Sequence, residues 1–193
     1  MTSDPAGATA MLETAAARPV VRGGGMDETE FDEFYTASFT RIVGQLHAMI
    51  GNRDEAQDCV QEAFARAWSH RARLDRVGHP EAWVRTTAYR LAVSRWRRTV
   101  VRRRPADRAL QPERPVAGPG PDRVALLAAL AELPLDQRRA LVLHHLCDLS
   151  VAAVAAETGA PEGTVKARLS RGRAALAALL DDPRSRPEGA HHG

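Results

Sequence analysis

Two helices joined by a tight turn are predicted between Leu149 and Leu176, and this pattern constrains the chain more than any other. Gly159 ends the first helix and Pro161 begins the second, because glycine suits a helix exit and proline suits a first helical position. Apolar or small residues recur along one side of the second helix and predict one buried stripe, made of Val165, Leu169, Gly172 and Leu176.

The opposite face of this second helix is suited to DNA. Its ridge consists of small residues, namely Gly163, Ala167, Ser170 and Ala174. Polar and cationic residues flank the ridge, Thr164, Arg168 and Arg171 on one side and Lys166 and Arg173 on the other. A small ridge lets a helix sit deep in a major groove while its charged edges meet phosphates. An ordinary amphipathic hairpin with a solvated basic face is the alternative interpretation.

The helical pattern continues along the chain, and no strand pattern occurs. Before the hairpin, helices are predicted for Phe31–Ile50, for a segment capped by Asp54 and reaching His70, for Pro80 to at least Arg98, for Asp122–Leu133 and for Leu135–Leu146. A loop, Arg71–His79, precedes the third of these. Few aromatic residues, 5% of the chain, suit small helical bundles, and 193 residues allow one or two such units. The predicted fold class is therefore all-α.

Three segments are expected to lie outside the packed helices. Met1–Glu30 mixes alanine, threonine and proline with three consecutive glycines, which predicts a disordered leader. Pro105–Pro121 holds five prolines and two glycines and is the predicted flexible linker. Pro183–Gly193 is a predicted frayed tail. The chain is thus divided into two bundles, Phe31–Arg104 and Asp122–Asp182.

The charge distribution is more informative than the modest net charge of +3. Val77–Arg104 carries eight arginines against one acid, Glu81, whereas a globally basic coat is absent. Within this block the helix from Pro80 has a core stripe of Val84, Ala88 and Leu91. A second stripe combines an aromatic, hydroxyls and arginines, in the order Trp83, Thr87, Arg90, Ser94 and Arg97. Such a face suits single-stranded DNA, since bases stack on indole and arginines follow the backbone.

Alternatively, Trp83 is a core residue of a small bundle, because tryptophan is usually largely buried. Trp68 and Trp96 are expected to be core or partly buried. The helix that reaches His70 has a core stripe of Ala56, Val60, Phe64 and Ala67. Its outer face carries Glu55, Asp58, Glu62 and Ser69, which predicts an acidic surface for a basic partner, with Asp58 and Glu62 on the exposed side.

Several function classes are not expected. No stretch approaches the roughly 18 apolar residues of a spanning helix, and the first residues show no positively charged segment followed by an apolar run, so secretion is not expected. Cys59 and Cys147 fall in different predicted units, which fits a reduced cytosol, and Cys59 is expected to be a small buried hydrophobe. His144, His145 and Cys147 lack a distant ligand cluster with zinc-like spacing, so neither metal nor cofactor is predicted. The sequence shows no nucleophile–base pair and no glycine-rich phosphate loop, so an enzyme is not predicted.

Four sequence blocks together resemble the extracytoplasmic-function (ECF) sigma factors, the two-domain type of the sigma-70 family. In chain order they are DEAQDCVQEAFARAW (Asp54–Trp68), HPEAWVRTTAYRLAVSRWRR (His79–Arg98), LPLDQRRALVLHHLCDLS (Leu133–Ser150) and GAPEGTVKARLSRGRAAL (Gly159–Leu176). The resemblance extends from about Phe31 to Leu180. It implies a region 2-like domain before the linker, a region 4-like helix-turn-helix domain after it, and promoter-directed initiation by core RNA polymerase.

The resemblance also implies roles for matching residues. Asp58, Gln61 and Glu62 match the stretch that docks on the clamp helices of the largest polymerase subunit, and the polymerase flap is a further expected contact. The part that melts and reads the minus-10 element is matched by His79, Trp83, Thr87, Arg90, Ser94 and Arg97. The helix that reads the minus-35 element is matched by Thr164, Lys166, Ala167, Arg168, Ser170, Arg171 and Arg173.

Double- and single-stranded promoter DNA, core polymerase and a separate anti-sigma factor are the expected partners, in the cytoplasm at the nucleoid. A carboxy-terminal sensor domain is not expected, because the sequence runs only briefly past the last motif. Two features depart from the family. Ser150 is followed by no acid, so its capping box is missing. Arg90 or Leu91 and Ser94 replace the family's Asn and Asp. A stand-alone helix-turn-helix regulator is the alternative function, and core polymerase binding would distinguish the two.

Overall fold

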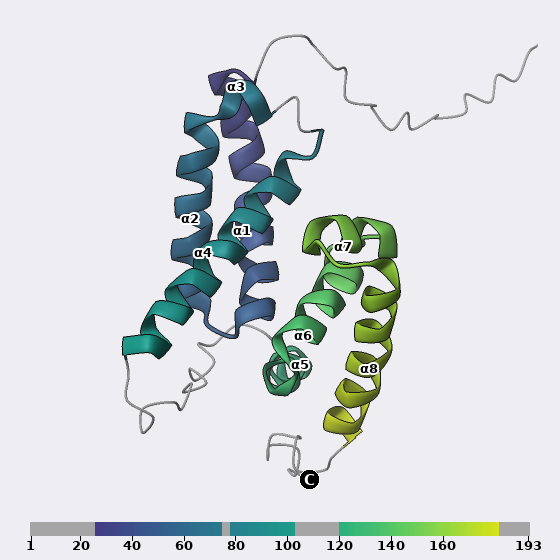
Figure 1. Ribbon diagram of the computed structural model, residues 1–193. Helices are drawn as coiled ribbons and strands as arrows, with labels where there is room; N and C mark the ends of the chain where they lie inside the picture. The colour runs from purple at the N-terminus through teal and green to yellow at the C-terminus, as the bar shows by residue number, and fades with distance from the viewer. Residues whose placement is uncertain (1–25, 75–77, 103–119, 182–193) are drawn as a thin grey trace, which may run out of the picture.

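The computed structural model describes residues 26–74, 78–102 and 120–181, and these residues are helical with no strand among them (Figure 1). An amino-terminal bundle contains α1 (Glu28–Ile50), α2 (Arg53–Ser69), α3 (Arg71–Leu74) and α4 (Pro80–Arg102). A carboxy-terminal bundle contains α5 (Pro121–Glu132), α6 (Leu135–Leu141), the π-helical turn η3 (Val142–Leu146), α7 (Val151–Thr158) and α8 (Glu162–Asp181). The all-α prediction is confirmed. Most of the predicted leader and linker, and the tail, lie outside the described residues.

The helix starts in the amino-terminal bundle are set by side-chain caps. Asp27 and Glu30 form a reciprocal capping box, so α1 begins before the predicted Phe31. At α2 the cap is Asn52 rather than the predicted Asp54, because the Asn52 side chain accepts a hydrogen bond from the Glu55 backbone N–H at 2.7 Å. Between them Gly51 ends α1 in the left-handed conformation, φ 82°, which glycine adopts without strain.

The core of this bundle follows the predicted stripes. Ala56, Val60, Phe64 and Ala67 on α2 are all buried, as are Val84, Ala88 and Leu91 on α4. They meet the fully buried Ile42, Leu46 and Met49 of α1. Part of the predicted loop after His70 is helical, because α3 continues the chain beyond α2 and buries Leu74.

The carboxy-terminal bundle holds the predicted helical hairpin. Gly159 ends α7 with φ 69°, and Ser150 caps it by accepting a hydrogen bond from the Ala153 N–H at 3.1 Å, without an acid in the first turn. Along α8, Val165, Leu169 and Gly172 are buried as predicted, while Leu176 is partly buried. The start of α5 differs from the prediction. Its N-cap is Gly120 rather than Asp122, and no side chain forms a capping hydrogen bond there.

A change of helical winding follows α6. The predicted single helix Leu135–Leu146 is α-helical only to Leu141 and then becomes the π-helical turn η3. The exit from this turn is held by the Cys147 N–H donating to the Val142 carbonyl at 3.1 Å, and by a hydrogen bond between His144 Nδ1 and the Leu149 carbonyl at 2.7 Å. His144 therefore shapes the turn that leads into α7.

The two bundles lie against each other and share one hydrophobic cluster (Figure 1). Helix α1 contacts α5, α6 and η3. The buried Arg138 of α6 donates hydrogen bonds to the Met49 carbonyl at 3.4 Å, on α1, and to the Leu133 carbonyl at 3.1 Å. Among the described helices, none is long and apolar enough to cross a membrane.

Candidate functional site

The outer face of α2 carries the residues predicted to meet a protein partner. Asp58 and Gln61 are exposed, whereas Glu62 is only half-exposed. Arg95 of α4 donates to Glu62 at 2.7 Å, and Arg66 donates to the other oxygen of the same carboxylate. The hydrogen bond from Arg95, and after it that from Arg66, lowers the pKa of Glu62 despite partial burial. Glu62 therefore joins α2 to α4.

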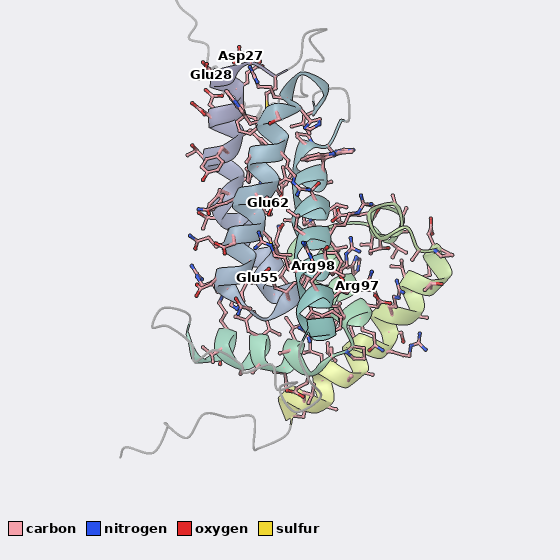
Figure 2. All side chains as sticks on the ribbon, turned by 60° about the vertical axis from the view of Figure 1, so that its left-hand side comes forward. Asp27, Glu28, Glu55, Glu62, Arg97 and Arg98 are labelled. Atoms are coloured by element: carbon pink, nitrogen blue, oxygen red, sulfur yellow. The ribbon has the colours of Figure 1, made fainter. Side chains whose placement is uncertain are left out.

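Two acids of the predicted outer face of α2, Glu55 and Glu62, are only partly exposed because both pair with Arg95. Glu55 also faces α4, where Arg95 lies 3.4 Å from its carboxylate, whereas Asp58 and Ser69 of the same face are exposed. Figure 2 shows Glu55 and Glu62 on the bundle surface, with Asp27 and Glu28 at the opposite end of the bundle from Arg97 and Arg98. Periodicity placed Glu62 on the outer edge of α2 but could not reveal an arginine on a neighbouring helix.

The predicted aromatic and cationic stripe on α4 changes character along its length. At its start Trp83 and Thr87 are half-buried, and the Trp83 ring packs on the core and lies 6.3 Å from the His70 ring. Trp83 therefore packs on the core, as the alternative interpretation predicts, but its ring is only half-buried. Farther along, Arg90, Ser94 and Arg97 are exposed, as is His79 just before the helix.

A shallow cavity of about 480 Å³ lies beside the exposed end of this stripe. Its lining comes from α4 and α6 and comprises Tyr89, Arg90, Val93, Ser94, Arg97, Arg98 and Arg139. The structure thus brings Arg90, Ser94 and Arg97 together, with Arg139 added from the other bundle. Sequence reasoning missed Arg139, since it lies far along the chain in a helix considered only for its core.

The other two tryptophans differ from each other. Trp68 is half-buried, as expected, with the Phe31 ring 5.1 Å away and the Arg71 guanidinium 4.2 Å above its ring. Trp96 was expected to be core or partly buried but is 49% exposed, which corrects that prediction. It therefore adds an aromatic surface next to Arg97.

The predicted DNA-reading face of α8 is open along most of its length. Its exposed members are Lys166, Ala167, Ser170, Arg171 and Arg173, while Thr164 and Arg168 are half-buried. Arg168 is paired with Asp136 of α6 at 2.6 Å. Arg173 turns back to donate to the Leu169 carbonyl at 3.3 Å. Small side chains on the ridge leave the backbone of α8 accessible between the charges, as major-groove entry requires.

Ligand-type side chains do not gather elsewhere among the described residues. In the described part of the chain, no three His, Cys, Asp or Glu side chains are placed to hold a metal ion. Burial, the largest cause in each case, raises the pKa of the Cys59 thiol to about 12 and that of Cys147 to about 11. Both thiols are therefore protonated at neutral pH and lack the thiolate character of reactive cysteines.

Comparison with known proteins matches this geometry to a family. Residues 34–102 match Sigma-70 region 2, and residues 123–176 match Sigma-70, region 4. The "Probable RNA polymerase sigma-C factor" of Mycobacterium bovis is 32% identical over 171 residues, covering 86% of this chain and 89% of that protein. The "ECF RNA polymerase sigma factor EcfG" of Rhodopseudomonas palustris is 34% identical over 139 residues, covering 69% of this chain and 75% of the relative.

Solved structures agree in fold. The sigma factor RpoE of Bartonella quintana, in complex with the anti-sigma factor NepR, matches with a TM-score of 0.70 at 24% identity, covering 81% of this chain and 99% of that one. CnrH, in complex with the cytosolic domain of CnrY, matches with a TM-score of 0.61 at 22% identity, covering 81% of this chain and 91% of that one.

The two matched regions cover more than half of the chain in the order expected of a two-region factor. The chain therefore belongs to the ECF RNA polymerase sigma factors of the sigma-70 family. Such a protein directs core RNA polymerase to promoters and takes part in transcription initiation.

Proposed function

We propose that the two bundles divide the work of promoter recognition. The amino-terminal domain, residues 31–104, would dock on core polymerase and engage the minus-10 element, and the carboxy-terminal domain, residues 122–182, would bind the minus-35 element. Residues 105–121 would tether them. The observation that carries this division is the open cationic face of α8 on a helix-turn-helix, set apart from the acidic and aromatic surfaces of α2 and α4.

At the minus-35 element, α8 enters the major groove with its amino-terminal part. Thr164, Lys166, Ala167 and Ser170 lie near that end or on the ridge and approach base edges. Arg168, Arg171 and Arg173 are better placed for phosphates. The pairing of Arg168 with the exposed Asp136 is a minor obstacle, since exposed ion pairs contribute little and are easily exchanged for a phosphate.

At the minus-10 element, the α4 stripe binds the opened DNA strand. Arg90, Ser94 and Arg97 follow the strand, while Trp83 offers the exposed part of its ring to a base, with His79 and Thr87 beside it. Trp83→Ala should reduce open-complex formation on duplex promoters more than on pre-melted ones, because one stacking platform is worth roughly 1–3 kcal/mol. Permanganate footprinting measures the opening. Equal loss on both templates, or lost helicity, would assign Trp83 to the core alone.

For core polymerase we assign direct contact to Asp58 and Gln61 on the open part of α2, facing the clamp helices. Glu62 contributes mainly by fixing α2 against α4 through Arg95. The carboxy-terminal domain is assigned the polymerase flap. The protein acts as a binding factor and not as an enzyme, without a cofactor, in the cytoplasm at the nucleoid where polymerase and promoters are found.

An anti-sigma factor completes the proposal. Both structural neighbours named above were solved with a protein partner, and in the first of them the sigma factor RpoE is bound by the anti-sigma factor NepR. We infer that a separate anti-sigma protein holds this chain until a signal releases it. A stand-alone helix-turn-helix regulator is the second candidate, favoured only by the carboxy-terminal bundle.

The test is run-off transcription with purified core polymerase, followed by mapping of start sites across a genomic library. We expect promoter-specific initiation that depends on this protein. Specific DNA binding with no association with core polymerase would instead identify a stand-alone regulator.

A further inference from the structure

The shallow cavity between α4 and α6 gathers positive charge. Four of its seven described lining residues are arginines, namely Arg90, Arg97, Arg98 and Arg139. The other three are Tyr89, Val93 and Ser94, so the described lining holds no carboxylate. A cleft lined by charges of one sign raises the local concentration of ions of the opposite sign. The cavity therefore has the electrostatic character of an anion site.

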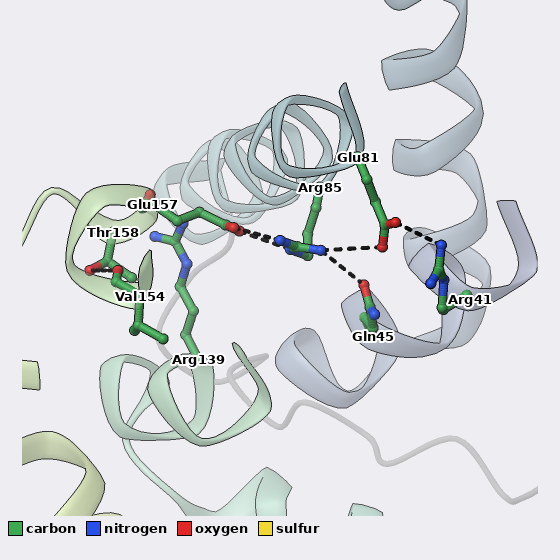
Figure 3. Close-up of polar contacts among 8 residues, drawn as sticks. All are labelled: Arg41, Gln45, Glu81, Arg85, Arg139, Val154, Glu157 and Thr158. Carbon is green, nitrogen blue, oxygen red and sulfur yellow. Dashed lines mark hydrogen bonds and ion pairs between the residues drawn. The ribbon is translucent and has the colours of Figure 1, made fainter. Parts of the chain in front are cut away.

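Arg139 of α6 is fixed at this cavity without a described carboxylate partner. Its guanidinium lies 4.0 Å from the centre of the Tyr89 ring and donates to the Glu157 backbone carbonyl at 3.2 Å. The Glu157 carboxylate is engaged elsewhere, because Arg85 donates to both of its oxygens, at 2.9 Å and 2.6 Å (Figure 3). Burial, the largest cause, lowers the pKa of Arg139, and the charge of Arg90 lowers it further. A bound anion would relieve this repulsion.

The other three arginines line the cavity from α4. Arg90, Arg97 and Arg98 are exposed. Hydrogen bonds from Arg98 to the Ser94 carbonyl and the Ser94 hydroxyl, both at 3.3 Å, orient its guanidinium. The Ser94 hydroxyl accepts from Arg98 and still carries a proton that it can donate to an anion. Residues three and four apart are neighbours on a helix, so this turn of α4 presents its donors to a ligand together.

We propose that this cavity binds a small anion with two linked phosphate groups, the chemistry shared by inorganic pyrophosphate and the diphosphate of a nucleotide. One phosphate group carries about 1.5–2 negative charges at neutral pH, so two of them balance four guanidinium charges. Guanidinium groups bind phosphate oxygens through paired hydrogen bonds. The cavity volume of about 480 Å³ lies within the roughly 300–1,000 Å³ that is usual for small-molecule sites.

Arg139 separates this site from the strand-binding face proposed above. A DNA strand follows exposed arginines along a helix, and Arg90 and Arg97 suit that role. Arg139 is half-buried and packed on Tyr89, so it contacts a compact ligand that enters the cavity rather than a strand lying along α4. Dependence of binding on Arg139 therefore distinguishes the two kinds of ligand.

Isothermal titration calorimetry of the free full-length chain with inorganic pyrophosphate, at low and constant ionic strength, tests the site. Arg139→Gln should weaken the affinity by about tenfold or more, because it removes a charged hydrogen-bond donor. Arg53→Gln makes the same change at an exposed arginine of α2 outside the cavity, and should leave the affinity unchanged. Equal affinity in the wild type and Arg139→Gln, or an equal loss in both variants, would overturn the proposal.

A second variant keeps the test decisive if Arg139→Gln disturbs the packing on Tyr89. Ser94 is exposed, so Ser94→Glu places a carboxylate in the cavity without entering the core. The new acid should pair with the arginines and reduce pyrophosphate affinity by about tenfold or more. Circular dichroism and thermal melts check that each variant is folded. Pyrophosphate binding that persists in folded Ser94→Glu would overturn the site.

Adenosine diphosphate, titrated in the same way, distinguishes the sources of the ligand. Tighter binding of the nucleotide than of pyrophosphate would support the proposal and assign the site to nucleotides, whereas equal affinity would support it with inorganic oligophosphate as the ligand. In both cases the affinity must fall in Arg139→Gln. A nucleotide and a pyrophosphate that both fail to bind the wild type would overturn the proposal.

A bound oligophosphate would occupy Arg90 and Arg97, and this consequence rests on the proposed function, which assigns both to the minus-10 strand. Pyrophosphate should weaken binding of a single-stranded oligonucleotide to the wild type but not to Arg139→Gln, at matched ionic strength. Equal competition in both proteins would assign the cavity to DNA alone and overturn the proposal. Absence of oligonucleotide binding by every protein would refute the proposed strand-binding role instead, and the calorimetry distinguishes this case because it needs no DNA.

Discussion

Cationic residues serve opposite purposes in α4 and α8. On α4, Arg95 pairs with Glu55 and Glu62 of α2, and Arg85 is buried against Glu157. On α8, Lys166 and Arg171 point to solvent, and only Arg168 meets a carboxylate among the contacts described. The arginine-rich block of the sequence is therefore used partly for internal ion pairs, and among its described side chains only Arg90, Arg97 and Arg98 are exposed on α4. On the less basic α8, three of the four cationic residues are exposed. Charge density along a sequence does not by itself locate a nucleic-acid surface.

The largest effect is expected where α2 presents an acid with no described internal partner. Asp58→Arg should weaken core polymerase affinity by roughly tenfold or more, because a like charge against a basic partner costs up to several kcal/mol. Stability should stay unchanged, since Asp58 is exposed. Glu62→Arg is the contrasting variant and should lower the melting temperature through repulsion from Arg95 and Arg66. Surface plasmon resonance and thermal melts measure both. Wild-type affinity in Asp58→Arg would contradict the docking assignment.

The two glycines of α8 differ in their surroundings, because Gly172 is buried and Gly163 is exposed. A Cβ at Gly172 would lie 2.9 Å from Leu141 Cδ1 and 3.4 Å from Gln137 Cβ, so α6 approaches α8 closely there. Gly172→Val should destabilise the protein by about 1–3 kcal/mol through overpacking. Gly163 on the same helix faces open space, and Gly163→Ala should stabilise by about 0.5–1 kcal/mol. Urea unfolding checks both, and equal effects would contradict the described packing.

The salt dependence of DNA affinity and the preferred sequence together separate phosphate-contacting from base-reading residues on the exposed face of α8. Arg171→Ala should weaken binding to all upstream sequences alike and reduce the slope of log affinity against log salt by about one ion. Lys166→Ala should instead change which upstream sequence is preferred. Fluorescence anisotropy at several salt concentrations measures the first, and selection from randomised promoters measures the second. A Lys166 variant that selects the wild-type sequence would remove this residue from the readout.

The smallest expected effect is on the free energy of unfolding at low pH, through the ion pair between Glu62 of α2 and Arg95 of α4. The pKa of Glu62 is below its ordinary value of 4.5 because Arg95 and then Arg66 hydrogen-bond to it. Its stabilising contribution is therefore present above about pH 4.5 and is lost as pH falls through the folded-state pKa. The difference in unfolding free energy between wild type and Glu62→Gln should be a few tenths of a kcal/mol at pH 7, given partial exposure, and should shrink below pH 4.5. Glu33→Gln, which makes the same chemical change at an exposed position on α1, should show no such dependence.

Local sequence determined the helix ends at two glycines and the core faces. Gly51 and Gly159 end helices because they adopt left-handed backbone at no cost, and they do so whatever surrounds them. The stripes from Ala56 to Ala67 and from Val165 to Gly172 follow from the helical repeat alone. These features depend on residues within a few turns of one another, so they were predictable. The family resemblance depended on the same local blocks.

Tertiary structure decided which polar side chains remained available for partners. Periodicity predicts that Glu62 is open to a partner, but Arg95 pairs with its carboxylate, and Trp96, predicted to be core or partly buried, is 49% exposed. The pairing of Arg85 with Glu157 joins residues 72 positions apart, and neither helical periodicity nor composition contains that relation. A charge is paired or free according to what lies within a few ångströms of it, and only the packing of distant helices determines those neighbours.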